Sequence, residues 1–91
     1  MDAQLAFADH GGTGPFWFTT PNGGIEPGSR VTASICELDA NGNPQTGAAV
    51  MTVQNVVPLN SEIAFHVSIM QDAVNPWPNP LNFRVSYMFV T

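Results

Sequence analysis

The sequence predicts an all-β fold, a small antiparallel two-sheet β-sandwich with five to six strands, in a single domain over residues 1–91. Apolar and polar residues alternate with a period of two in four stretches of the C-terminal two-thirds of the chain. Eight glycines and eight prolines supply turns, and no window has the apolar spacing of three and four residues that a helix requires. A sandwich buries the apolar faces of so many strands, and a small β-barrel is the alternative.

The strands nearest the N-terminus are expected to be short. Residues 16–20 form an aromatic and β-branched run between two turn-forming stretches, which is typical of a strand that ends in a tight turn. Residues 5–8 are a second candidate strand. Phenylalanines flank Trp17, so we expect this side chain in the core, with an exposed aromatic platform as the alternative.

Four longer strands follow, and each alternates as a half-buried strand does. They are expected at residues 30–38, 49–57, 62–70 and 82–90. In the second of these, the inward side is less clear: one side is expected to hold Met51, Val53 and Val57, and the other Val50, Thr52, Gln54 and Val56. The last two alternate most clearly, and their inward residues predict most of the core: Ile63, Phe65, Val67, Ile69, Phe83, Val85, Tyr87 and Phe89.

The connections between the strands differ in character. Turn formers predict a long loop at residues 39–47 and a tight link at 58–61, and alternating prolines predict a stiff loop at 72–80 around Trp77. Residues 39–50, DANGNPQTGAAV, resemble the strand-loop-strand stretch of bacterial immunoglobulin-like domains, in which a similar turn precedes a hydrophobic strand. The resemblance fits a sandwich, immunoglobulin-like or jelly-roll-like, and identifies no family.

Charge is scarce in this chain. Only nine of the 91 residues are charged, and none of them is lysine. An average soluble domain has about 25% charged residues, and sheets usually protect their edges with lysine. The acidic net charge of −5 argues against binding to nucleic acid or to anionic lipid. The missing protection therefore indicates a surface that meets another protein or a neutral ligand.

Several other classes are not expected. Residues 1–14 lack the basic and apolar regions of a secretory signal, and no apolar run is long enough to span a membrane. Cys36 is the only cysteine, which excludes an internal disulfide and leaves the cellular compartment open. We expect it to be a buried free thiol.

We expect no enzymatic activity, no catalytic residues and no cofactor. His66 and Ser68 share a strand face, but residues two apart on a strand point in parallel, which does not suit proton transfer from a nucleophile to a base. The glycine-rich residues 11–14 lack the lysine and the following helix of a phosphate-binding loop.

A calcium loop is the nearest approach to a metal site. Asp39, Asn41 and Asn43 place side-chain oxygens at alternate positions, as calcium loops do. The sixth and twelfth positions, however, hold Pro44 and Val50 instead of glycine and glutamate. A β-turn without metal is therefore expected here, and the pattern leaves weak calcium binding open.

The outward-facing residues of the strands suggest a homo-oligomer. If the strands lie side by side, small hydroxyl side chains and methionines share one nearly uncharged face, which resembles a surface that is buried in an assembly. We therefore expect a non-enzymatic, self-associating β-domain that acts as an oligomeric structural or binding subunit. Its expected interface residues are His66, Ser68, Met70, Arg84, Ser86 and Met88.

A small lectin-like module that binds a neutral glycan is the alternative function. Trp77 lies on the stiff proline-rich loop and could stack on a sugar ring, while neighbouring amide and carboxylate groups could bind its hydroxyls. The expected ligand-binding residues are Trp77, Asn75, Asn79 and Asp72.

Overall fold

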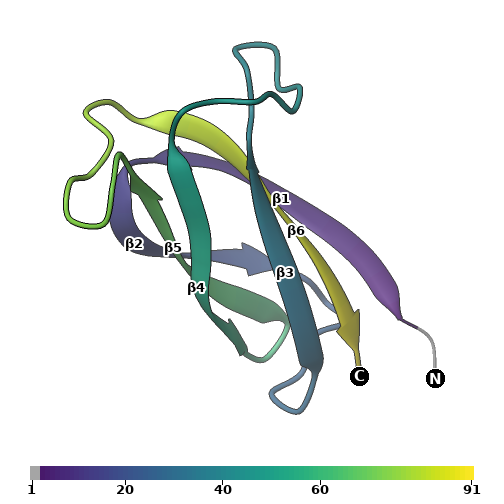
Figure 1. Ribbon diagram of the computed structural model, residues 1–91. Helices are drawn as coiled ribbons and strands as arrows, with labels where there is room; N and C mark the ends of the chain where they lie inside the picture. Colours follow the sequence, from purple (N-terminus) through teal and green to yellow (C-terminus); the bar gives the residue numbers. More distant parts are fainter. Residues whose placement is uncertain (1–2) are drawn as a thin grey trace.

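The computed structural model describes residues 3–91, and this part of the chain contains six β-strands (Figure 1). They are β1 (Gln4–Gly12), β2 (Gly14–Pro21), β3 (Arg30–Glu37), β4 (Val50–Pro58), β5 (Glu62–Met70) and β6 (Leu81–Val90). All four alternating stretches are strands, as expected. The first two strands are longer than expected, and β1 extends well beyond residues 5–8. Within residues 3–91, no helix is long and apolar enough to cross a membrane.

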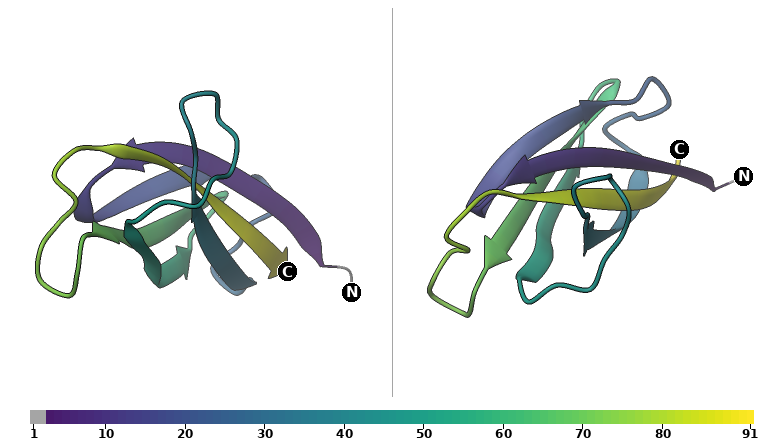
Figure 2. Two further views of the ribbon diagram at one scale, coloured as in Figure 1. Left: turned by 45° about the horizontal axis from the view of Figure 1, so that its top comes forward. Right: turned by 90° about the horizontal axis from the view of Figure 1, so that it is seen from above.

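The strands form two antiparallel three-stranded sheets. One has the order β1-β6-β3 and the other the order β2-β5-β4. The sheets pack against each other and do not close into a barrel, so the sandwich prediction is confirmed (Figure 2). The two most regularly alternating strands, β5 and β6, lie at the centres of the sheets because each has a fully apolar inner side to bury.

The core lies between β5 and β6. All eight inward residues predicted on these strands are buried. Phe18 of β2 and Ile25 of the following loop complete the buried cluster. The rings of Phe65 and Tyr87 lie 5.4 Å apart, and those of Phe18 and Phe83 lie 5.8 Å apart, so aromatic pairs join the two sheets directly.

A tight corner carries the chain from one sheet to the other between β1 and β2. Gly14 has a φ of +68°, a left-handed conformation that favours glycine. A Cβ atom on Gly12 would lie 2.5 Å from the ring of Phe16, so this position needs glycine for space. The corner therefore depends on two glycines for different reasons.

A β-bulge in β4 makes the expected placement of Val57 on the same side as Met51 and Val53 wrong. The pairing of β4 with β5 shifts between Val53 and Asn55, and the extra residue reverses the alternation that follows. Val56 consequently packs against the core and Val57 does not. A bulge depends on the pairing with the neighbouring strand, which the residues of β4 alone do not reveal.

The loop between β2 and β3 closes one end of the sandwich. Ile25 is 1% exposed and belongs to the core cluster, although it lies outside any strand. Its amide donates to the Asn22 carbonyl, and the Asn22 side-chain amide donates to the hydroxyl of Tyr87 at 3.0 Å. At the other side of the loop, the Ser29 hydroxyl accepts from the Glu26 amide. These hydrogen bonds hold Ile25 between the sheets.

Candidate functional site

The six expected interface residues do not share one face. The two central strands belong to different sheets, so their outward residues point in opposite directions from the sandwich. We call the outer side of sheet β1-β6-β3 the β6 face and the outer side of sheet β2-β5-β4 the β5 face. Arg84, Ser86 and Met88 lie on the β6 face, whereas His66, Ser68 and Met70 lie on the β5 face.

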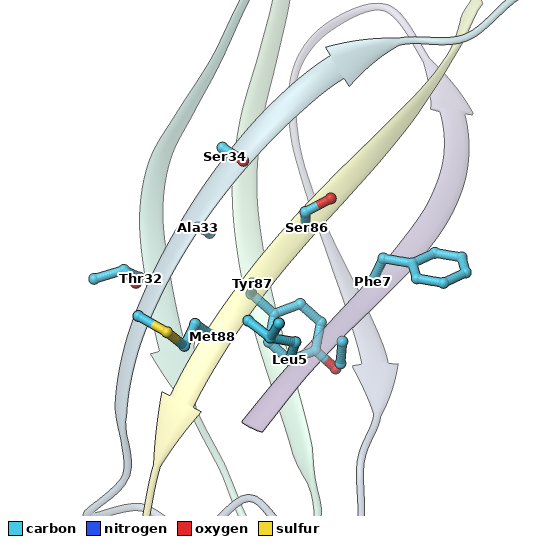
Figure 3. A pocket seen from close by; sticks show the side chains of 9 residues that line it. Leu5, Phe7, Thr32, Ala33, Ser34, Ser86, Tyr87 and Met88 are labelled. Carbon is cyan, nitrogen blue, oxygen red and sulfur yellow. The ribbon is translucent and has the colours of Figure 1, made fainter. Parts of the chain in front are cut away.

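The β6 face contains a shallow hollow of about 600 Å³. Leu5 and Phe7 of β1 line it together with Met88 of β6, and Ser34 and Ser86 add small hydroxyls (Figure 3). Leu5 is 83% exposed, Phe7 61% and Met88 43%. Leu5 is paired with Met88 across the strands, so the exposed apolar side chains form a continuous cluster rather than isolated contacts.

Leu5 and Phe7 are absent from the expected interface residues. Residues 5–8 alternate large and small side chains, Leu5 and Phe7 with Ala6 and Ala8, and this pattern normally places the large residues in the core. In the structure the two alanines face the core and the two large residues face outward. Asp9 lies on the same side of β1 as Leu5 and Phe7, and its charge is the feature of the sequence that could have indicated that this side faces outward.

Arg84 and Asp9 on the β6 face neutralise each other. Arg84 Nε donates to Asp9 Oδ1 at 2.7 Å, and Arg84 Nη2 donates to Oδ2 at 3.0 Å. The same guanidinium lies 4.5 Å from the centre of the Phe7 ring. The hydrogen bonds from Arg84 lower the pKa of Asp9, so the pair stays ionised and carries no net charge at neutral pH. The cluster next to it is therefore electrically neutral.

The β5 face carries a stacked aromatic pair. Trp17 of β2 lies over His66 of β5, with ring centroids 4.9 Å apart and planes 17° from parallel. Trp17 is 52% exposed, so its expected place in the core is wrong. Alternation along β2 turns the flanking Phe16 and Phe18 inward and Trp17 outward. Ser68, next along β5, is only 5% exposed although it points to this outer face.

Trp77 lies at the end of the sandwich, on the loop between β5 and β6. It is half-buried and packs against the core, its amide donates to the Ile69 carbonyl at 3.1 Å, and its own carbonyl accepts a hydrogen bond from the Thr13 hydroxyl. Asp72 and Asn75 are hydrogen bonded to each other on the exposed part of the same loop, and Asn79 is also exposed. The structure thus brings Asp72 and Asn75 together and leaves Trp77 partly covered.

Replacing Asn75 with alanine should raise the pKa of Asp72 toward its ordinary value. The Asn75 side-chain amide is the main group that lowers this pKa, and the amides of Val74 and Asn75 add to the effect. The ionised form is favoured in the fold, so its stabilisation is present above the ordinary value of 3.8 and is lost as the pH falls through the lowered pKa. An NMR titration of the Asp72 carboxyl carbon measures the change, and an unchanged pKa in the variant would contradict the assignment.

The loop at residues 39–47 has the turn structure that its sequence predicts. Asp39 Oδ1 accepts hydrogen bonds from the amides of Asn41 and Asn43, at 2.8 and 2.9 Å, and Gly42 adopts a left-handed φ of +81°. One Asp39 carboxylate oxygen is therefore occupied by hydrogen bonds within the turn. Within residues 3–91, no three His, Cys, Asp or Glu side chains form a group that could hold a metal ion.

The remaining candidate side chains lie apart from one another. His10 stacks on Phe18 at the β1–β2 corner, with centroids 4.7 Å apart. Cys36 is a half-buried free thiol on β3, opposite Arg84 of β6. His66 is on the other sheet, beneath Trp17.

No protein family, curated protein or solved structure was found to match this chain.

Proposed function

We propose that this protein is a non-enzymatic, self-associating β-domain that acts as an oligomeric structural or binding subunit. The observation that carries the proposal is the exposed apolar cluster of Leu5, Phe7 and Met88 on the β6 face. The charged residues of β1 and β6 within residues 3–91, Asp9 and Arg84, are paired with each other. Arg30 lies on the same face, at the start of the edge strand β3. A second copy that covers the cluster and leaves Arg30 at the rim would bury apolar area without burying an unpaired charge.

The energy available from this cluster is of the size that association needs. Complete burial of a large apolar side chain contributes about 1.5–3 kcal/mol relative to exposure. A symmetric contact uses the same patch on both copies and so buries Leu5, Phe7 and Met88 twice. The gain is comparable to the roughly 4–15 kcal/mol that is lost when two molecules associate. The cluster therefore offsets the cost of association, and the rest of the contact must supply the roughly 8 kcal/mol that a micromolar dissociation constant requires.

Replacing Leu5 with lysine should convert the protein to a monomer. The new charge would lie in the middle of the buried cluster, whereas the stability of the isolated chain should change by no more than about 0.5 kcal/mol because Leu5 is exposed there. Light scattering coupled to size-exclusion chromatography measures the mass. Thr19→Lys, an equal change at an exposed position of β2 on the β5 face, is the matched control and should keep the wild-type mass.

Two results would contradict the proposal. The first is a wild-type protein that stays monomeric at micromolar concentration over a range of salt concentration and pH. The second is an oligomer whose mass is unchanged by Leu5→Lys, which would mean that the apolar cluster is not part of the contact.

Binding of a neutral glycan is a second candidate function, and the Trp17–His66 stack favours it. The exposed indole offers the flat apolar surface on which sugar rings stack, and the described charged residue of this face, Glu62, lies at the far end of β5. The loop with Trp77, Asn75, Asn79 and Asp72 is the other possible position. A glycan array with Trp17→Ala and Trp77→Ala distinguishes the two, since binding is lost in only one variant. Absence of wild-type binding, with and without calcium, would contradict this function.

A further inference from the structure

We propose that the second copy adds its own β1 to the free edge of β1, as an antiparallel strand about a two-fold axis. Sheet β1-β6-β3 would then continue into the sheet of the other copy. This inference rests on the proposed self-association and specifies its geometry. Main-chain hydrogen bonds between the two edges would supply most of the contact, and Leu5 and Phe7 would meet across it, whereas Met88 on the central strand β6 would stay exposed.

The other three edge strands carry features that block such pairing. Prolines cannot donate a main-chain hydrogen bond, and β2 contains Pro15 and Pro21. The β4 edge ends at Pro58 and is interrupted by its bulge. The remaining edge strand, β3, lies beside β4 of the other sheet and begins and ends with charged residues, Arg30 and Glu37.

The edge of β1 has none of these features. Gln4–Gly12 contains no proline, lysine or arginine, and its pairing with β6 runs without a register shift. Its only charged residue, Asp9, is already bound by Arg84. Figure 3 shows the Phe7 side chain extending over β1 toward the free edge. A long, regular and apolar edge of this kind is the form that pairs with another strand.

The apolar residues of β1 match a second copy of the same edge, and the charge of Asp9 limits the register. In a two-fold antiparallel pair centred on Ala6, Leu5 of each copy lies opposite Phe7 of the other. In a pair centred on Phe7, the two Phe7 side chains lie opposite each other. The first register joins Leu5 to Phe7, whereas the second also places Leu5 of each copy opposite Asp9 of the other. Both keep the two Asp9 side chains well apart, whereas a centre at Asp9 would place these like charges directly opposite each other.

The other described acidic residues do not oppose this contact. They lie in loops or at the ends of strands β3 and β5, away from the β1 edge: Glu26, Glu37, Asp39, Glu62 and Asp72. Among residues 3–91, no unpaired carboxylate therefore lies in the contact, and the net charge of −5 acts over the molecule as a whole.

Disulfide trapping tests the geometry in a Cys36→Ser background. Opposite residues in a strand pair are within disulfide reach. If the pair is centred on Phe7, the Phe7→Cys protein alone forms a covalent dimer on oxidation. If the pair is centred on Ala6, an equal mixture of the Leu5→Cys and Phe7→Cys proteins forms one. Thr32→Cys, an exposed outward position on the opposite edge strand β3, is the control and should stay uncrosslinked. No more covalent dimer from the β1 cysteines than from this control would overturn the inference.

Light scattering on two lysine variants separates edge pairing from stacking of two β6 faces. Edge pairing predicts that Phe7→Lys halves the mass of the wild-type dimer, whereas Ser86→Lys, in the exposed floor of the hollow, retains it. Loss of the dimer in both variants indicates stacked faces, which overturns the edge inference but leaves self-association intact. A monomeric wild-type protein overturns both.

Discussion

Replacing Phe83 with alanine should lower the free energy of unfolding by about 3–5 kcal/mol. The Phe83 side chain is fully buried in β6 and lies about 6 Å, centroid to centroid, from the rings of Phe16, Phe18 and His10. Phe16 and Phe18 belong to the other sheet, and His10 is paired with Phe83 on the neighbouring strand β1, so the truncation opens a cavity where the two sheets meet. Such a loss is a large part of the roughly 5–15 kcal/mol that stabilises a typical domain.

Urea unfolding followed by tryptophan fluorescence measures this loss. All variants are compared at one protein concentration, because self-association adds to the apparent stability of every variant that retains it. Val74→Ala is the control, since Val74 is 80% exposed and should change the free energy of unfolding by less than about 0.5 kcal/mol. A Phe83→Ala protein as stable as this control would show that the ring does not fill the space between the sheets.

Replacing Ile25 with alanine should cost about 2–5 kcal/mol, although the residue lies in a loop. Its side chain is 1% exposed and packs with the core at the end of the sandwich that the loop closes. The neighbouring Glu26→Gln change is a matched control, because Glu26 is exposed and its hydrogen bond to Ser29 uses the main-chain amide. The same urea experiment applies, and equal midpoints for the two variants would contradict the buried role of Ile25.

Alternation predicted the strands well because one side of each long strand is buried and the other is not. In β5 and β6 the inward side is wholly apolar, and every residue predicted there is in the core. The pattern in β1 is harder to interpret, since its large residues face outward and its small ones inward. Of this strand, only residues 5–8 are expected from the sequence.

The arrangement of the expected site could not be predicted because it depends on pairing between distant strands. Ser68 and Ser86 occupy equivalent outward positions on their strands, yet β5 and β6 are in different sheets, and the two hydroxyls lie on opposite sides of the molecule. Ile25 posed a different difficulty. A single apolar residue in a turn-rich loop has no periodicity that would indicate its burial.

The position of β6 has a consequence for how the molecule folds. Both β1 and β3 pair only with β6 inside their sheet, and Gln4 lies opposite Phe89. Neither can join a sheet until the most C-terminal strand has formed, so folding must close very long loops before most contacts are made. Proteins with such topologies fold on the order of milliseconds to seconds. Throughout that interval both edges of β1 are open, and β6 of its own chain competes for this strand with any neighbouring copy.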